Sequence, residues 1–572
     1  MEAKKGYLWE QTECTKKENT IAYFSMEICV DSEIPTYSGG LGILAGDTIR
    51  SSADLGVPMI AMTLLYKKGY LKQTIDQQGY QQEFPEEWDP QEFLTLLPDQ
   101  VQVEIEQRMV RIQAWMYMVR GIDGDVIPVY FLDTDIPENS DYDRSLSYYL
   151  YGGDEKYRLA QETILGIGGV RMLKELGFHN ISKYHMNEGH ASLLALELLS
   201  QHAHQEENEW GIEQVKKMCV FTTHTPVPAG IDQFSYELVR QVLGEPIPYD
   251  LLKNLGGADR LNMTQLALNL SQFINGVAKR HGMVSREMFP GYHIDSITNG
   301  VHSATWTGKN FSKLFDQYIP GWKSDPFSLR YALNIPDNEV WDTHLKAKEE
   351  LIDYINRQND SEFDKDSFTI GFARRATAYK RADLIFYDLN RLIDIARRKG
   401  KIQFVFAGKA HPKDYSGKEL IQKIIHESKQ INKYIKITYL ENYNMDLGKM
   451  LTTGVDLWLN TPRKPKEASG TSGMKAAHNG IPSFSILDGW WVEGCIEGIT
   501  GWSIGSAANT QSIDQEEADS LYQKLEIKIL PTYYHRQNQW INIMRHCIAI
   551  NASFFNTHRM VLQYVSNAYL YR

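Results

Sequence analysis

The sequence has few cysteines and no long apolar run, and both absences narrow the class of protein. The five cysteines are scattered and form no CxxC pair, so neither a disulfide framework nor a cysteine-based zinc site is predicted. No stretch reaches the roughly 18 apolar residues of a membrane span. The polar residues 1–19 lack the apolar core of a secretion signal. We expect a protein of the reducing cytoplasm that binds no membrane and no metal.

Positive charge is also in deficit. The chain has 60 lysines and arginines against 72 acidic residues, which gives a net charge of −12 and a pI near 5.8. This balance argues against a general nucleic-acid partner, because such binders present an excess of basic residues. Any site for an anion must therefore be a local basic cluster.

The first 300 residues combine buried strands with alternating segments. Apolar runs at 21–28 and 59–65 predict strands, and a glycine-rich turn and a helical pattern at 43–55 lie between them. Alternating segments at 101–112 and 126–132 predict antiparallel strands. A further strand at 220–223 leads into a stiff turn that contains His224 and two prolines.

The remaining residues alternate more regularly. Apolar runs at 368–372, 402–407, 435–440, 455–459 and 483–487 predict buried strands, separated by helical stretches such as 381–399 and 419–431. Helical sequence continues from 516 and is predicted to break at Pro531.

These patterns predict an α/β protein of two Rossmann-like, doubly wound domains that face a central cleft. At 572 residues the chain is too long for one simple core. We expect residues 1–300 to form the first domain, with the antiparallel strands inserted, and residues 301–572 to form the second. The last helices are expected to cross back to the first domain. Ligands in such sheets bind at the carboxyl ends of the strands.

One segment concentrates the groups of a phosphate-binding turn. Residues 467–475 read Glu-Ala-Ser-Gly-Thr-Ser-Gly-Met-Lys and follow the predicted strand at 455–459. Gly470 and Gly473 allow close approach of the backbone to a ligand, and a helix start favours an anion. Lys475 there is either a phosphate cation or an amine that condenses with an aldehyde. An ordinary strand-turn-helix corner with a solvated lysine is the alternative interpretation.

A second basic cluster consists of Arg374, Arg375, Lys380 and Arg381. The first pair ends a predicted strand and the second pair opens a predicted helix. Four cations at a helix N-terminus oppose the helix dipole, so the arrangement favours a bound phosphate over a merely solvated helix start.

Three further segments are less specific. The turn Gly39-Gly40-Leu41-Gly42 fits a ligand-binding loop or a tight strand-to-helix turn. His224 fits a structural role at least as well as a catalytic one. The segment 187–190, Asn-Glu-Gly-His, fits an N-capped helix start.

Together these segments resemble the α-glucan (glycogen, starch and maltodextrin) phosphorylases, in order and in local spacing, over roughly residues 20–500. The segment at Lys475 resembles the pyridoxal-phosphate lysine motif of that family. The resemblance implies that pyridoxal 5′-phosphate is bound covalently to Lys475 as an internal aldimine. It also implies a two-domain glycosyltransferase architecture and a role in glycogen degradation.

The resemblance implies a role for each matching residue. Gly40, Arg375 and Lys380 would hold the substrate phosphate, and the carbonyl of His224 would face the sugar ring. The cofactor would contact Arg374, Lys380, Thr471, Gly473, Tyr443 and Trp306. Glucosyl hydroxyls would contact Glu467, Ser469, Gly470, Asn299 and Leu41. Glu188 and His190 would lie on the acceptor side.

The implied reaction is reversible, retaining phosphorolysis of terminal α-1,4-linked glucosyl units. Its partners would be an α-glucan, inorganic phosphate and glucose 1-phosphate, with the cofactor's 5′-phosphate relaying a proton. A sugar-nucleotide glucosyltransferase of the glycogen or starch synthase kind is the alternative, and it would need no aldimine lysine. No oligomer interface is indicated by the sequence.

Several departures from the family pattern indicate a compact member. Asn444 stands where well-studied members have an arginine, and Glu188 replaces an aspartate. The segment at residues 27–39 is far shorter than the matching segment of the long animal and plant enzymes. Residues 133–158 leave no room for the long projecting helix of those enzymes.

Overall fold

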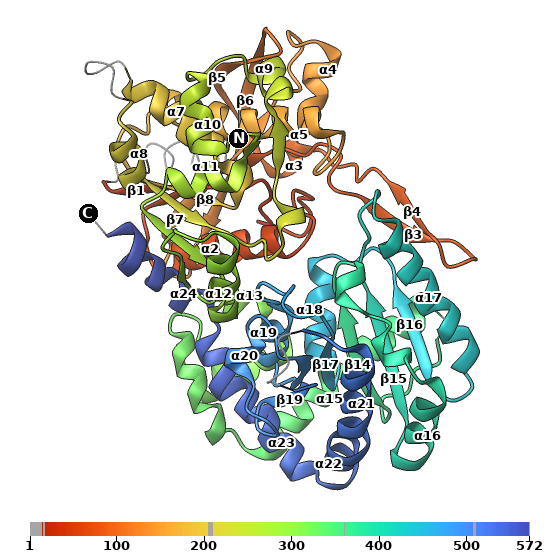
Figure 1. Cartoon of the computed structure of the whole chain (residues 1–572). Helices are drawn as coiled ribbons and strands as arrows, with labels where there is room; N and C mark the ends of the chain where they lie inside the picture. Colours follow the sequence, from red (N-terminus) through yellow and green to blue (C-terminus); the bar gives the residue numbers. More distant parts are fainter. Residues whose placement is uncertain (1–13, 15–17, 204–209, 360, 507–510, 571–572) are drawn as a thin grey trace.

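The structure is a computed structural model that describes residue 14 and residues 18–203, 210–359, 361–506 and 511–570 (Figure 1). Its frame is a pair of large sheets, one from each half of the chain. The first has nine strands in the order β13-β12-β9-β8-β1-β2-β7-β6-β5, all parallel except for the antiparallel β6. They are β1 (Thr20–Phe24), β2 (Met59–Leu64), β5 (Thr95–Ile105), β6 (Arg108–Arg120), β7 (Val126–Asp133), β8 (Ile181–Asn187), β9 (Cys219–Thr222), β12 (Phe273–Gly276) and β13 (Asp295–Ser296).

The second sheet has six parallel strands in the order β16-β15-β14-β17-β18-β19. They are β14 (Phe368–Ala373), β15 (Ile402–Ala407), β16 (Lys436–Leu440), β17 (Leu457–Asn460), β18 (Ser483–Ile486) and β19 (Gly501–Ile504). This is the strand order 3-2-1-4-5-6 of a doubly wound fold. The predicted α/β class with two Rossmann-like sheets is confirmed.

Helices cover the faces of both sheets, as parallel strands require (Figure 1). The first half contains α2 (Gly40–Asp54), α3 (Pro90–Phe93), α4 (Asp141–Arg144), α5 (Glu155–Thr163), α6 (Gly169–Glu175), α7 (Leu193–His202), α8 (Ile212–Met218), α9 (Tyr236–Leu243), α10 (Tyr249–Gly256), α11 (Met263–Asn269) and α12 (Lys279–Met288). The second half contains α13 (Ser303–Trp306), α14 (Lys309–Tyr318), α15 (Asp337–Asn359), α16 (Leu389–Lys399), α17 (Tyr415–Ile431), α18 (Met445–Gly454), α19 (Ser472–Ala477), α20 (Trp491–Gly494), α21 (Asp514–Lys524), α22 (Leu530–His535), α23 (Gln537–His546) and α24 (Thr557–Tyr564). None of the described helices is long and apolar enough to cross a bilayer.

Two segments connect the halves. The hairpin of β3 (Lys72–Ile75) and β4 (Gln81–Phe84) leaves the first half and reaches α17 in the second (Figure 1). In the opposite direction, α24 packs against α2, where Thr557 and Ser51 share a hydrogen bond of 2.5 Å between their hydroxyls. Tyr569, beyond α24, bonds to the buried His185 of β8 (2.7 Å).

Several predicted element boundaries are wrong, and three of the differences have a clear physical reason. The strand predicted at 101–112 is a hairpin of β5 and β6, because Glu106 and Gln107 have positive φ and reverse the chain. The helix predicted from 381 begins at Leu389, where the Asp388 side chain accepts a hydrogen bond from the Arg391 amide. The predicted break at Pro531 is displaced to Arg536, because the π-helical turn Leu525–Ile529 directly before Pro531 already interrupts the α-helical hydrogen-bond pattern and accommodates the proline.

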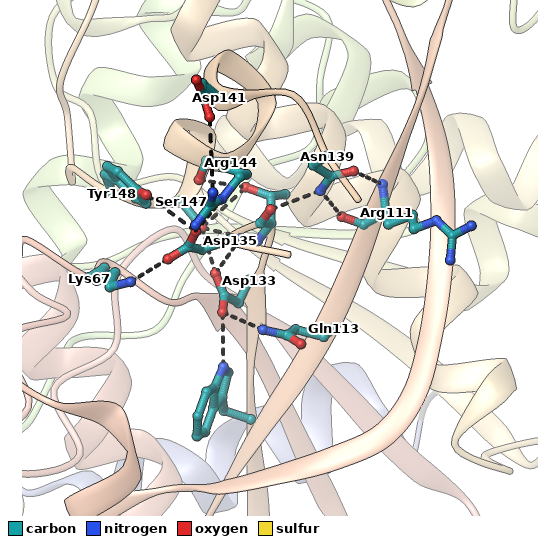
Figure 2. Close-up of polar contacts among 12 residues, drawn as sticks. Lys67, Arg111, Gln113, Asp133, Asp135, Asn139, Asp141, Arg144, Ser147 and Tyr148 are labelled. Atoms are coloured by element: carbon teal, nitrogen blue, oxygen red, sulfur yellow. Dashed lines mark hydrogen bonds and ion pairs between the residues drawn. The ribbon is translucent and has the colours of Figure 1, made fainter. Parts of the chain in front are cut away.

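The chain after β7 is folded back by one buried carboxylate. Asp133 accepts hydrogen bonds from Trp115, Gln113 and Ser147 at 2.8–3.0 Å (Figure 2). Between Asp133 and α5 the chain forms only the four-residue α4 and a short 3-10 turn. This network therefore positions residues 134–150, which lead to the rim of the cavity described next.

Candidate active site

A cavity of about 1180 Å³ lies between the two sheets. It is bordered by the chain that follows the first strands of both sheets, β1 and β14, where the strand order reverses. Every predicted site residue except Gly473 lines this cavity. Those that do are Gly40, Leu41, Glu188, His190, His224, Asn299, Trp306, Arg374, Arg375, Lys380, Tyr443, Glu467, Ser469, Gly470, Thr471 and Lys475.

The glycine-rich turn presents an uncapped helix start to the cavity. Helix α2 begins at Gly40, three positions before the predicted helical pattern, and it has no side-chain cap. A Cβ added at Gly39 or Gly40 would meet no atom within 4 Å, so open space lies beside them. The amides of Ser38 and Gly39 are held by the Glu27 carboxylate at 2.5 and 3.2 Å. The first turn of α2 is thus positioned to receive an anion.

Lys475 lies in α19 with its amine buried among aromatic and carboxylate groups. Its Nζ is 3.7 Å from the ring centroid of Trp306. The Trp306 Nε1 in turn donates to the buried Asp47 carboxylate at 2.7 Å. Burial lowers the pKa of Lys475 to about 8. A large fraction of the amine is therefore neutral near pH 8, as condensation with an aldehyde requires.

Two cations converge on Glu467. Arg374 Nη2 donates to its carboxylate at 2.7 Å and Lys380 Nζ at 2.6 Å. Burial alone would raise the pKa of Glu467, but these two cations hold it at about 2. The Nε and Nη1 atoms of Arg374 are buried without a hydrogen-bond partner. Such orphaned guanidinium donors fit an anionic group in the cavity.

The basic cluster is built differently from the prediction. Lys380 ends a 3-10 turn (Ala378–Lys380), and Arg381 follows it with φ +45°, so the pair opens no α-helix. Arg381 points away from the cavity and pairs with Asp514 and Glu517 at 2.7 and 2.6 Å. Arg381 is therefore a structural residue, and the other three members of the predicted cluster, Arg374, Arg375 and Lys380, line the cavity.

The opposite wall contains a strained glutamate. Glu188 follows β8 with φ +87°, a conformation that is unfavourable for a side chain with a Cβ. Its carboxylate accepts hydrogen bonds from the amides of Gly189 and His224 (2.8 and 2.7 Å) and from the Thr225 hydroxyl (2.9 Å). These three bonds fix the His224 turn against the end of β8.

Both histidines of this wall are neutral. His190 Nε2 accepts a hydrogen bond from the Met26 amide at 2.9 Å, so its proton lies on Nδ1. Burial lowers the pKa of His190 to about 3 and that of His224 well below its usual range. His224 Nε2 contacts the Asn187 side-chain oxygen at 2.7 Å and therefore carries the proton.

Several buried polar atoms of the cavity wall have no partner in the protein. They include the hydroxyl of Ser469 and the side-chain oxygen of Asn299. Gly470 has φ +83°, which brings its backbone to the cavity in a conformation that favours glycine. Unpaired buried oxygens beside an open cavity fit a ligand rich in hydroxyl groups.

Two predicted residues have a packing role. A Cβ at Gly473 would lie 2.8 Å from the Trp490 ring and from the Ser483 hydroxyl, so Gly473 allows α19 to pack closely. Asn444, which replaces an expected cation, caps α18 by accepting a hydrogen bond from the Leu447 amide at 2.9 Å.

The sequence interpretation missed several charged residues of the cavity or its support, and four of them have a clear structural role. Glu27 holds the glycine turn, and Asp47 holds Trp306. Arg158 and Asp232 form an ion pair (2.8 Å) on the cavity wall. Glu27 could have been found, because it is a carboxylate that comes shortly after a buried strand. The others lie within helical or irregular sequence without a distinctive motif.

Comparison with known proteins defines the class. Residues 249–502 match the family model of the carbohydrate phosphorylases. The chain is 40% identical to the maltodextrin phosphorylase of Thermococcus litoralis, across 98% of this chain and 72% of that protein. It is 36% identical to a glycogen phosphorylase of Mycobacterium tuberculosis, across 96% of this chain and 70% of that protein. It is 33% identical to the glycogen phosphorylase of Aquifex aeolicus, across 96% of this chain and 86% of that protein. The chain belongs to the carbohydrate phosphorylase family.

Proposed function

We propose that this chain catalyses the reversible phosphorolysis of terminal α-1,4-linked glucosyl units of an α-glucan such as glycogen or maltodextrin. The product is α-glucose 1-phosphate. The observation that carries the proposal is the buried amine of Lys475 in the same cavity as the unpaired donors of Arg374 and the open glycine turn. The names of the relatives, maltodextrin phosphorylase and glycogen phosphorylase, support it.

The residues at Lys475 fit pyridoxal 5′-phosphate. The amine would hold its aldehyde carbon, and the ring of Trp306 and the side chain of Tyr443 would border it. Arg374, Lys380 and Thr471 would hold its phosphate, which is consistent with the unpaired Nε and Nη1 of Arg374. When bound, the cofactor supplies a phosphate group that exchanges a proton with the substrate phosphate. Gly473 contributes to this site through the packing of α19.

The substrate phosphate binds beside the glycine turn. Its oxygens face the start of α2 at Gly40 and the cations Arg375 and Lys380. These charges offset the repulsion between two neighbouring phosphates and hold one oxygen close to the anomeric carbon. Preorganised charge of this kind lowers the barrier without rearrangement of the site.

The glucosyl unit is held by the polar atoms that lack a protein partner. Ser469 and Asn299 supply such atoms to its hydroxyls, and Gly470, Leu41 and the paired carboxylate of Glu467 border the same space. The bond between the glycosidic oxygen and the anomeric carbon breaks, and the glycosidic oxygen takes a proton from the substrate phosphate. A phosphate oxygen then bonds to that carbon on the same face. Positive charge that develops at the ring is stabilised by the nearby carbonyl of His224.

The acceptor side of the site is assigned to Glu188 and His190. His190 is neutral, its Nε2 accepts from the Met26 amide and its ring proton is directed at the Asn187 backbone carbonyl, so it borders the leaving glucan without a charge. A reducing compartment is proposed for the reaction, in agreement with five cysteines that form no disulfide, four of them buried.

The direct test is the product formed from maltodextrin. With inorganic phosphate, the chain loaded with pyridoxal phosphate should release α-glucose 1-phosphate, detected by phosphorus and proton magnetic resonance. Without phosphate it should release no glucose. Transfer from a nucleotide-activated glucose, with no product from phosphate and maltodextrin, would replace this proposal with a nucleotide-sugar glucosyltransferase.

A further inference from the structure

Three potential metal ligands from distant segments meet outside the active-site cavity. They are Asp54 at the end of α2, His302 just before α13, and His558 in α24. The Nε2 atoms of His302 and His558 lie 2.8 and 2.9 Å from the same oxygen, Oδ2 of Asp54. All three side chains are buried, with exposed fractions of 4–8%.

Asp54 and His302 each make a second hydrogen bond that fixes the orientation of the side chain, whereas His558 does not. Asp54 Oδ1 accepts a hydrogen bond from the Ile122 amide at 2.9 Å, which leaves Oδ2 to the two imidazoles. His302 Nδ1 contacts the Thr305 hydroxyl at 2.6 Å. The Nδ1 atom of His558 has no partner in the protein.

We propose that Asp54, His302 and His558 form a binding site for a divalent transition-metal ion, through Oδ2 and the two Nε2 atoms. Imidazole nitrogen together with carboxylate oxygen is a donor set that suits zinc and its neighbours better than magnesium or calcium. Tetrahedral coordination at about 2.0–2.1 Å separates the donors by roughly 3.3 Å. The two Nε2 atoms lie 2.8 and 2.9 Å from Oδ2, and all three donors lie within 4.8 Å of one another, so modest side-chain movements bring them to this spacing.

The competing explanation is a clamp of hydrogen bonds without an ion. In that arrangement both imidazoles carry a proton on Nε2 and donate it to Asp54. With an ion, both Nε2 atoms are bare and the protons lie on Nδ1. His302 then donates to Thr305, which is the outer hydrogen bond that metal-bound histidines usually make.

The position of the site suggests what the ion does. It would join the end of α2, the segment that leads to Trp306, and the crossover helix α24. The next residue, Arg559, donates to the backbone carbonyl of Asn299 at 2.9 Å, so α24 also supports the cavity wall. A bound ion would therefore stabilise the attachment of α24 to the first half of the chain, outside the reaction itself.

The test uses the full chain, stripped with a chelator and then dialysed against zinc. Elemental analysis should give one ion per chain, and zinc should raise the melting temperature. His302→Gln and His558→Gln should weaken zinc binding at least 10-fold. A glutamine amide can still donate to Asp54, so these variants retain the hydrogen-bonded clamp and should fold. His293→Gln is the control. His293 is exposed and also lies beside an aspartate, Asp295 (3.4 Å), but among the described residues it belongs to no group that could hold a metal ion.

Cobalt provides a second, independent measurement. Cobalt bound at this site should show the visible bands of tetrahedral nitrogen and oxygen coordination, and no thiolate charge-transfer band from a cysteine. The proposal is overturned if stripped wild-type chain takes up no zinc. It is equally overturned if His302→Gln and His558→Gln leave the stoichiometry and affinity unchanged.

Discussion

Lys475 is the residue on which the account depends most, because burial changes its chemistry. Its Nζ lies against the Trp306 ring, and the charges that act on it are those of Asp47, which raises its pKa, and Lys449, which lowers it. Burial outweighs the attraction of Asp47 and lowers the pKa to about 8. The fold thus favours the neutral amine, which is the nucleophile, over the ammonium ion.

Replacement of Lys475 by methionine should stabilise the cofactor-free protein near pH 7. The folded pKa of about 8 is below the ordinary 10.5, so this lysine destabilises the fold while it is charged. The difference corresponds to about 3 kcal/mol. The stabilisation should be full below pH 8 and shrink as the pH rises from 8 to 10.5. Denaturant melts of both proteins at pH 7 and 9.5 would measure it, and an equal difference at the two pH values would contradict the buried-amine account.

Replacement of Glu467 by glutamine should have the opposite effect and lower the free energy of unfolding near pH 7. The carboxylate has a folded pKa of about 2, against an ordinary 4.5, because Arg374 and Lys380 outweigh its burial. It therefore contributes about 3 kcal/mol that is present above pH 4.5 and is lost as the pH falls toward 2. Glu467→Gln should lose this stability at pH 7. Its free energy of unfolding should also fall less steeply than that of the wild type as the pH drops from 4.5 to 2, as denaturant melts would show.

Inorganic phosphate should compensate the same variant. Glu467→Gln leaves Arg374 and Lys380 without their carboxylate, so a phosphate should raise the melting temperature of the variant more than that of the wild type. Thermal melts of the cofactor-free proteins, with sulfate as a second anion and chloride as the control salt, would show this. Equal shifts would mean that the two cations do not bind phosphate.

At the scale of single elements, the start of α2 allows function to be separated from folding. A Cβ at Gly40 meets nothing within 4 Å, whereas a Cβ at Gly42 would lie 2.7 Å from the Tyr37 Cβ and 2.8 Å from the Glu27 carboxylate. Gly40→Ala should therefore melt like the wild type but raise the KM for phosphate at least 10-fold. Gly42→Ala should lower the melting temperature. A normal KM for phosphate in Gly40→Ala would remove the glycine turn from the phosphate site.

Element types were predictable from the sequence to different degrees. Buried runs of β-branched and aromatic residues, such as 368–372, identified five strands of the second sheet, although Lys436 and Asp456 interrupt two of these runs. The turn at Glu106 and Gln107 gave no signal, since neither residue is a common turn former. Asp388, the true cap of α16, was a usable signal that the longer helical pattern obscured.

Site residues were predictable where a motif carries them. The segment at Lys475 and the pair Arg374–Arg375 were found because their sequence is distinctive, and the structure brings both to one cavity. The spatial partners were not predictable, since Arg158 and Asp232 are 74 residues apart and meet only through the fold. The structural role of Arg381 depended on Asp514 and Glu517, which no local pattern connects to it.

At the scale of the whole molecule, the β3–β4 hairpin connects the halves beside the cavity. The Gln81 amide group exchanges two hydrogen bonds with the backbone of Ala410, at 2.9 and 3.0 Å. The Gln73 backbone amide and side-chain oxygen bond to Asn442, and its side-chain amide donates to Gly408 at 2.9 Å. The hairpin therefore ties the first half to the edge of the second sheet.

Removal of this connection should loosen the halves without unfolding either sheet. In Gln73→Ala/Gln81→Ala, amide hydrogen exchange at 408–410 and 441–443 should become at least 10-fold faster. Exchange in β14 and β1 should be unchanged, because their hydrogen bonds lie within the sheets. Uniform acceleration would indicate general destabilisation, and no change at 408–410 would show that the hairpin does not restrain the second half.

The central claim is that this chain carries its cofactor on Lys475, and its most direct test is chemical. The full chain is incubated with pyridoxal phosphate, reduced with borohydride and mapped by mass spectrometry of its peptides, with Lys475→Met as the control. We expect one pyridoxyl group per chain, located on Lys475 and absent from the variant. A chain that acquires no pyridoxyl group, or acquires it on another lysine with Lys475 unmodified, would contradict the account.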